Sequence, residues 1–208
     1  MSVKYKASNV KSWAVNNSNK YKIDSSMFIQ MFMMERFMER LFCSPYRDNF
    51  ILKGGFLISS LAGIENRITK DLDANITGIH IDKDNLKEII NNVINIQRDD
   101  GVIFSIYKID SIREKLSPDD CRVVLNCKLE NTRSHFHIDI VNDDKIYPHP
   151  IAHEYKMLTN DERIAVKAVN VQSILADKIL AILYYGASGG RARDYYDVYL
   201  LLKYMGQI

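Results

Sequence analysis

One stretch, NFILKGGFLISSLAGIENRITKDLDANI from Asn49 to Ile76, constrains the fold of this chain more than any other segment. It contains an apolar run, two adjacent glycines, a second apolar run, and a third run that includes Asp71 and Asp73. Side chains alternate faces along a strand, so two residues separated by one point the same way. The pattern therefore predicts a strand, a glycine turn, a helix, and a second strand with two carboxylates on one face.

Two carboxylates on one strand face repel each other unless they share a cation. Mg²⁺ commonly binds one or two carboxylates together with substrate phosphate oxygens. Asp139, in the strand-like segment FHIDIV, could add a third carboxylate from a neighbouring strand. Three carboxylates on adjacent strands suit a two-metal site for phosphoryl or nucleotidyl transfer. We therefore expect Asp71, Asp73 and Asp139 to bind Mg²⁺ or Mn²⁺.

Gly54 and Gly55 supply the other half of such a site. Without Cβ atoms, the turn lets backbone N–H groups and the start of the next helix approach a phosphate. A Gly-Gly turn or a D-x-D segment is common when it occurs alone. Their order and spacing in this chain predict one nucleotide-binding unit.

The rest of the chain predicts an α/β protein with a mixed sheet and flanking helices. A helix is expected to begin at Ser25 or Ser26 and to end before Pro45, with a methionine-rich core face. Its charged residues are expected on the opposite face: Glu35, Arg36, Glu39 and Arg40. Further helices are expected over 82–97, 171–186 and 193–205, and strands over 102–109, 121–129 and 136–141. Residues 1–21 are polar enough to be loosely held.

This pattern divides the chain into an N-terminal helical segment (1–48), a core (49–145) and a C-terminal helical part (146–208). The net charge of +2 gives no global attraction to nucleic acid, so any such contact needs a local patch. Three cysteines without C-x-x-C spacing indicate reduced, packed thiols. We find neither a secretory signal nor an apolar run long enough for a membrane span, so we expect a cytoplasmic protein without a membrane partner.

Several separated motifs together resemble the bacterial AbiEii/AbiGii family of nucleotidyltransferase-like toxins. They are the stretch from Asn49 to Ile76, the segment FHIDIVNDD, and the C-terminal ILADKILAILYYGASGGRARDYYDVYLL. The resemblance runs from about Met31 to the end of the chain. It implies a polymerase-β-type nucleotidyltransferase fold and the toxin role in a toxin–antitoxin or phage-abortive-infection pair. It also implies transfer of a nucleotide from a nucleoside triphosphate (NTP) to tRNA or another acceptor, and a cognate antitoxin encoded nearby.

The resemblance also implies roles for individual residues. The triphosphate would be held by four residues: Gly54, Gly55, Arg67 and Lys178. The metal would be held by the acidic cluster: Asp71, Asp73 and Asp139. The family's R-D-x-x-D segment matches Arg193, Asp194 and Asp197.

The C-terminal motif can also be interpreted without the family. Asp194 and Asp197 are three residues apart, so they share one face near the start of a helix. Helix capping with a surface ion pair is the structural alternative, although we favour a catalytic role for Asp194. Lys178 lies in the apolar segment ILADKILAIL, where a lysine either reaches outward or is aimed at an anion.

Other functions remain open at this point. One is a non-catalytic module of the same fold that binds nucleotide or RNA. Another, less favoured, is a zinc-dependent hydrolase that uses His135, His137 and Asp139. An RNA acceptor could contact basic residues in a cleft: Lys167, Lys178, Arg113, Lys115, Arg191 and Arg193. Four tyrosines could stack on bases, although core packing is the slightly favoured interpretation: Tyr184, Tyr185, Tyr195 and Tyr196. The nucleobase, the acceptor, the antitoxin and the oligomeric state do not follow from the sequence.

Overall fold

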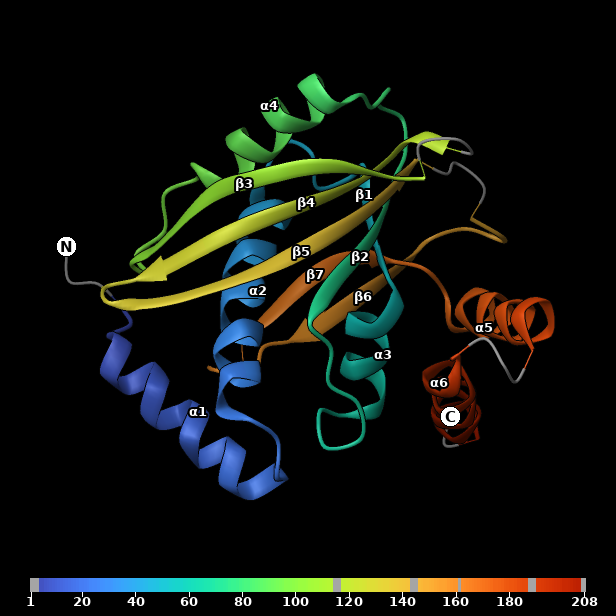
Figure 1. Ribbon diagram of the computed structural model, residues 1–208, viewed down its shortest axis with the longest axis horizontal. Coiled ribbons are helices and arrows are strands. Elements are labelled where there is room, and N and C mark those ends of the chain that lie inside the picture. The colour runs from blue at the N-terminus through green and yellow to red at the C-terminus, as the bar shows by residue number, and fades with distance from the viewer. Residues whose placement is uncertain (1–3, 114–116, 143–145, 161, 187–189, 207–208) are drawn as a thin grey trace.

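The computed structural model describes residues 4–113, 117–142, 146–160, 162–186 and 190–206 (Figure 1). Within them lie six helices: α1 (Ala7–Tyr21), α2 (Ser25–Cys43), α3 (Gly54–Ala62), α4 (Lys83–Ile94), α5 (Val171–Tyr185) and α6 (Ala192–Met205). Seven strands form one sheet: β1 (Phe50–Lys53), β2 (Asp71–Ile76), β3 (Val102–Arg113), β4 (Ser117–Leu129), β5 (Thr132–Asn142), β6 (Ile151–Lys156) and β7 (Arg163–Ala168).

The strand order in the sheet is β3-β4-β5-β2-β1-β7-β6. β2 runs parallel to β5, and β1 pairs antiparallel with β2 and parallel with β7, so the sheet is mixed as predicted. The strand, glycine turn, helix and strand expected from Asn49 to Ile76 are β1, α3 and β2. The adjacent chain segments therefore build the middle of the sheet.

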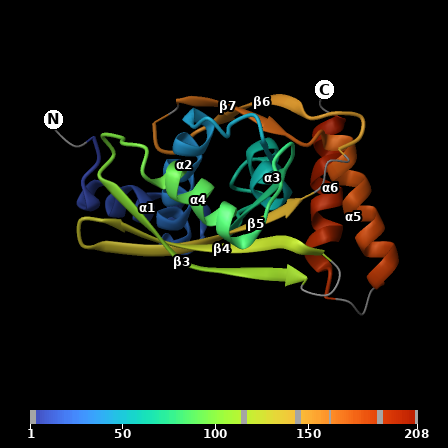
Figure 2. The same cartoon turned by 90° about the horizontal axis from the view of Figure 1, so that it is seen from above.

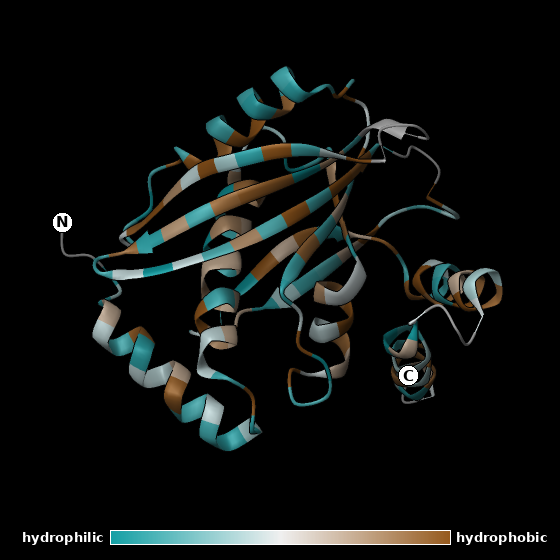
Figure 3. Cartoon of the chain, viewed as in Figure 1, coloured by the Kyte–Doolittle hydropathy of each residue, from teal (hydrophilic) through white to brown (hydrophobic). Residues whose placement is uncertain are grey.

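The sheet curves around a helical core. In Figure 2, α2, α3 and α4 lie between strands β3–β5 and the β6–β7 hairpin. Apolar and polar residues alternate along β4 and β5 (Figure 3), and the apolar ones, such as Val123, Leu125 and Phe136, are buried. The face of β4 and β5 that points away from the helices is largely polar, whereas the edge strand β3 exposes Ile103 and Tyr107. Asp71 and Asp73 lie on the continuation of this face, as the strand register shows.

The N-terminal segment differs from the expectation. Residues expected to be loosely held form α1, which buries Ala7, Val10 and Ala14 against α2. The cap of α2 is Asp24 rather than Ser25 or Ser26, because its carboxylate accepts a hydrogen bond from the Ser26 N–H at 2.7 Å. The helix ends before Pro45, as predicted.

The methionine face of α2 lies in the core, which confirms that prediction, but the expected charged face was wrong. Glu35, Arg36 and Arg40 are buried. Arg40 makes a two-pronged ion pair with Asp100, at 2.6 and 2.8 Å. Glu35 accepts hydrogen bonds from the Tyr155 hydroxyl and the Leu158 N–H. The β6–β7 hairpin covers this side of α2, so residues that look solvent-facing in the sequence become buried and paired.

The segment between 146 and 170 was assigned to the C-terminal helical part without a predicted helix or strand of its own, and it adds β6 and β7 to the sheet. The C-terminal helices begin at Val171 and Ala192, close to the predicted starts at 171 and 193. Of the cysteines, Cys121 and Cys127 are buried as predicted, whereas Cys43 is exposed. Among the described residues, no helix is long and apolar enough to cross a membrane.

Candidate active site

The two aspartates of β2 share one face with Asp139 of β5. In the register of the parallel pair, Asp73 lies opposite Asp139 and Asp71 opposite His137. Asp71 accepts a hydrogen bond from the Thr69 hydroxyl at 2.5 Å and lies 3.4 Å from His137 Nε2. The sequence prediction that these three carboxylates gather on neighbouring strands is therefore confirmed in register and face.

Asp73 is the most perturbed member of this acidic face. Burial of its carboxylate, together with the negative charges of Asp71 and Asp139, raises the pKa of Asp73 to about 6. A hydrogen bond from the Gly55 N–H, at 3.3 Å, and the charge of Lys53 oppose this rise. The site thus holds negative charge that the neighbouring protein groups only partly compensate.

The glycine turn is shaped around Asp73. Gly54 has a positive φ of 64°, and a Cβ added there would lie 2.0 Å from Asp73 Oδ2. A Cβ on Gly55 would lie 2.8 Å from Thr69 Oγ1 and 2.9 Å from Arg67 Nη2. Only glycine fits at Gly54, because both the backbone conformation and the space exclude a side chain. The first turn of α3 consequently approaches the acidic strand closely.

Asp139 faces a different partner. Arg122 of β4 donates two hydrogen bonds to its carboxylate, both at 2.7 Å. Within the described residues, no three His, Cys, Asp or Glu side chains come close enough together to hold a metal ion. Arg122 thus engages the Asp139 carboxylate, whereas the partly compensated charge of Asp71 and Asp73 fits a cation that also binds substrate oxygens. The zinc alternative built from His135, His137 and Asp139 gains no support, because His135 is exposed and no metal-binding group of three is found among the described residues.

Lys178 of α5 forms an ionic cluster with α6. Its ammonium lies 2.7 Å from Asp194 Oδ1 and 3.0 Å from Asp197 Oδ2. Burial alone would lower the pKa of Lys178, but the hydrogen bond to Asp194 and the charge of Asp197 outweigh it and raise the pKa. Asp197 is fully buried and also binds Arg67 Nε at 2.7 Å. Asp194 and Asp197 are thus a buried network and not a surface ion pair.

Most of these groups line one cavity of about 450 Å³, whereas Asp139 and Asp197 are not part of its lining. Its walls come from the β1–α3 turn, β2, α5 and the start of α6. The residues predicted from the sequence that line it are Gly54, Gly55, Arg67, Asp71, Asp73, Lys178, Arg191, Arg193 and Asp194. The cavity therefore carries both cationic side chains and carboxylates, which suits a polar, charged ligand.

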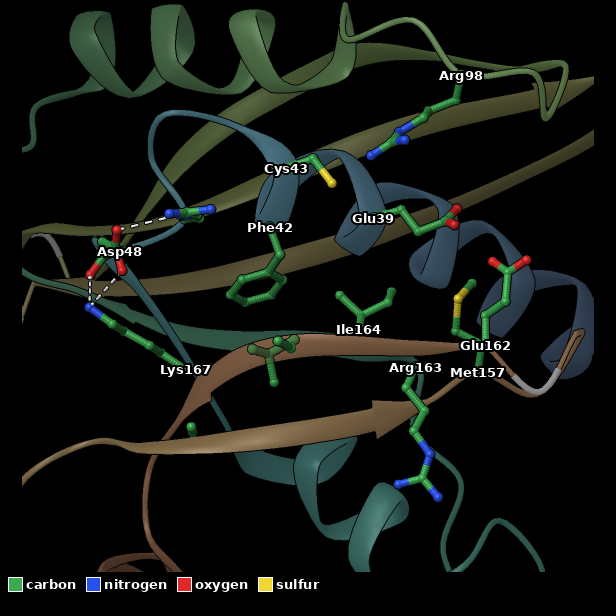
Figure 4. Close-up of a pocket in the computed structure, with 14 residues that line it drawn as sticks. Glu39, Phe42, Cys43, Asp48, Arg98, Met157, Glu162, Arg163, Ile164 and Lys167 are labelled. Carbon is green, nitrogen blue, oxygen red and sulfur yellow. Dashed lines mark hydrogen bonds and ion pairs between the residues drawn. The ribbon is translucent and has the colours of Figure 1, made fainter.

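Some predicted residues lie elsewhere. Lys167 lines a different cavity, between α2 and β7, where it pairs with Asp48 at 2.9 Å (Figure 4). The four tyrosines favoured as core residues are exposed, Tyr184 by 83%. Lys115 and the side chain of Arg113 lie outside the described residues.

The sequence analysis missed several residues of the cleft. Lys53 lies opposite Asp73 in the β1–β2 register, and Asp177 precedes Lys178 on α5; both line the cavity. Arg122 was detectable in principle, because strand alternation places it on the polar face of β4. Asn75 was detectable in the same way, since it continues the alternation of Asp71 and Asp73.

Comparison with solved structures shows the same fold. An antigenic nucleotidyltransferase-like protein from Paracoccidioides brasiliensis matches with a TM-score of 0.50 and 18% identity, over 74% of this chain and 67% of that one. JHP933 from Helicobacter pylori matches with a TM-score of 0.53 and 18% identity, over 85% of this chain and 66% of that one. This chain thus spans about two thirds of the length of each. The fold is an α/β nucleotidyltransferase fold.

No curated protein sequence matches this chain significantly. A family model does: residues 36–208 match the family described as "Nucleotidyl transferase AbiEii toxin, Type IV TA system". The match covers the glycine turn, all three strand carboxylates and both C-terminal helices. The chain belongs to the AbiEii nucleotidyltransferase toxin family.

Proposed function

We propose that this protein transfers a nucleotide from an NTP to an RNA acceptor, with a divalent cation, as the toxin of a toxin–antitoxin pair. The observation that carries this proposal is the single cavity in which the Gly54–Gly55 turn, the pair Asp71 and Asp73, and Lys178 come together. A phosphate chain fits there because cationic side chains and the start of α3 line the cavity. Mg²⁺ or Mn²⁺ fits beside Asp71 and Asp73.

In the proposed reaction, a hydroxyl oxygen of the acceptor attacks the α-phosphorus of the NTP. A new P–O bond forms, the bond between the α-phosphorus and the bridging oxygen breaks, and pyrophosphate leaves. The hydroxyl proton passes to a carboxylate of the acidic face. Asp71 and Asp73 would hold the metal, which when bound would offset phosphate charge and activate the attacking oxygen. Arg67, Arg191 and Lys178 would bind and orient the triphosphate.

The polar face of the sheet supports a nucleic-acid acceptor. Lys128 and Arg133 are paired neighbours on β4 and β5, and Asn126 and His135 lie next to them on the same face. All four are exposed. This surface leads along β5 to His137 and Asp139, so an RNA backbone bound there would reach the acidic face. The exposed tyrosines of α5 and α6 offer further stacking surfaces.

The decisive experiment separates an enzyme from a binding module. Purified protein is incubated with each of the four α-labelled NTPs, Mg²⁺ and total RNA, and label on RNA is resolved by gel. We expect label on a defined RNA, lost with EDTA and with Asp71→Ala. Tight NTP binding without labelled product for any nucleotide would refute the transferase and favour the non-catalytic module.

Two double variants test the acceptor surface. Lys128→Ala with Arg133→Ala should weaken binding of labelled RNA by about tenfold or more at low salt, and less as salt rises. Lys83→Ala with Lys87→Ala, on α4, removes the same charge from the opposite side of the sheet and should have little effect. Equal losses in both variants would show that only net charge matters.

The toxin role implies an antitoxin as partner. Expression without it should slow bacterial growth if the activity is toxic, and Asp71→Ala should relieve that effect at equal protein level. Growth inhibition that persists in Asp71→Ala would argue against nucleotide transfer as its cause.

A further inference from the structure

A second cavity, of about 780 Å³, lies beside the candidate active site. The two cavities share Lys53, Val169 and Asp177 in their walls. They are therefore adjacent compartments of one cleft, on either side of the start of α5. The first contains the charged groups suited to phosphate, whereas the second is lined mainly by neutral polar and apolar side chains.

Asn75 sits in the wall of this second cavity. It is the next residue on the Asp71 and Asp73 face of β2, two residues beyond Asp73, or roughly 6–7 Å along the strand. Only 5% of Asn75 is exposed, and its Oδ1 has no hydrogen-bond partner among the residues that the structure describes. A buried carboxamide oxygen without a donor is unfavourable. A ligand that donates an N–H to it would remove that penalty.

Another part of the wall is held in place by the cap of α5. Asn170 accepts the Ser173 N–H at 2.9 Å, while its amide donates to the backbone oxygens of Tyr147 and His149 at 3.0 and 3.3 Å. Tyr147 and His149 line the cavity, and the Tyr147 ring is largely exposed. The wall thus presents planar side chains from a loop that the helix cap fixes, which suits a planar ligand.

We propose that the second cavity binds the nucleobase of the NTP, and that Asn75 accepts a hydrogen bond from an N–H group on the Watson–Crick edge of that base. This inference rests on the proposed function, in which the neighbouring cavity binds the triphosphate. The two compartments follow the order of one nucleotide, because phosphate groups lie at Asp71 and Asp73 and the base lies further along the same strand face. Asn75 would then be a specificity-determining residue for the NTP.

The test compares wild type with Asn75→Val, which suits a strand flanked by Ile51 and Val141. Binding with Mg²⁺ is measured by calorimetry for the four NTPs, for inorganic triphosphate, and for an analogue of the best NTP that lacks the edge N–H donor. Asn16→Val, at an exposed asparagine on α1 that lines neither cavity, is the matched control. Asn75→Ala is a second variant if the valine protein does not fold.

We expect wild type to bind the best NTP at least about tenfold more tightly than its donor-less analogue, because the analogue leaves Asn75 unpaired. Asn75→Val should abolish this preference, leave triphosphate binding unchanged, and melt at the same or a higher temperature. Asn16→Val should behave as wild type. A purely structural asparagine would instead lower the melting temperature without changing base preference.

Equal preference in wild type and Asn75→Val, with triphosphate still bound, would overturn the inference and leave the proposed function intact. Unchanged NTP binding with loss of transfer to RNA would also overturn it, by placing the acceptor nucleotide in this cavity. Failure of wild type to bind triphosphate at all would refute the proposed function itself.

Discussion

Replacing Asp73 with Asn should make the protein without ligand more stable. The same change should remove the stabilisation that a divalent cation and a nucleotide give to the wild type. Asp73 is buried next to two other carboxylates, and its pKa is raised from 3.8 to about 6. A carboxyl whose folded pKa is raised favours folding in its protonated form. That stabilisation is fully present below about pH 3.8 and is lost as the pH rises through about 6. At neutral pH, Asp73 therefore carries a charge that the folded protein disfavours.

The magnitude follows from the size of the pKa change. A rise from 3.8 to about 6 corresponds to about 3 kcal/mol at 1.36 kcal/mol per pH unit, as an upper value for the gain from an uncharged side chain. Asn has nearly the same shape, and its side-chain oxygen can still accept the Gly55 N–H. We expect Asp73→Asn to raise the free energy of unfolding at pH 7.5 by about 1–3 kcal/mol and to leave it nearly unchanged at pH 4.

Urea unfolding between pH 4 and 8 measures this directly. The difference between Asp73→Asn and wild type isolates Asp73, because other titrating groups are common to both proteins. Asp110→Asn, an exposed strand aspartate paired with Lys108, is the control and should change stability by less than about 0.5 kcal/mol. Mg²⁺ with NTP should raise the melting temperature of wild type but not of Asp73→Asn. A variant less stable than wild type at pH 7.5 would refute the reasoning, since it would show that the charge is compensated.

Three further changes test other parts of the structure. Gly54→Ala should lower the free energy of unfolding by well more than the roughly 1–2 kcal/mol of backbone strain, because the new Cβ overlaps Asp73. Gly186→Ala is the control, since Gly186 has the same φ but no neighbour within 4 Å. Equal losses of unfolding free energy in the two variants would contradict the overlap. Burial raises the pKa of Glu35 to about 7, so the free energy of unfolding of the wild type should fall as the pH rises from 4.5 through 7. Glu35→Gln should make the free energy of unfolding, measured with urea, less dependent on pH over that range. Lys178→Met should lower the free energy of unfolding, measured by heat and urea, by about 3–5 kcal/mol, because Asp194 and Asp197 stay buried without the lysine charge. Lys203→Met, at the exposed end of α6, is the control and should change the free energy of unfolding little.

The middle of the sheet was predictable because its signals are local. Strand alternation and the glycine pair within Asn49–Ile76 define β1, α3 and β2 without any distant contact. The same holds for α4, whose apolar spacing matches the residues that it buries: Leu86, Ile89, Ile90 and Val93. Local periodicity is sufficient wherever one face of an element meets the core and the other meets water.

The same logic failed for α2 because two of its sides are covered. Periodicity identifies an apolar face, but it cannot indicate that a distant hairpin will cover the polar one. Glu35 is about 120 positions away from Tyr155, which donates to it at 2.8 Å. β6 and β7 were missed for a related reason, since short strands at the end of a sheet have weak alternation. Because the β6–β7 hairpin was not predicted, the charged residues of α2 that it covers were expected to face solvent.

The candidate site shows how far a motif can be taken without a structure. The sequence shows that Asp194 and Asp197 share a helix face, but not that this face is turned inward onto Lys178. Nor does it show that Asp197 also binds Arg67, whose Nη2 lies against the Gly55 backbone. These contacts form a chain from α6 through Arg67 to the glycine turn. The position of α6 therefore helps to set the geometry of the turn that is proposed to bind phosphate, so the C-terminal motif can affect nucleotide binding even where its carboxylates do not touch the nucleotide.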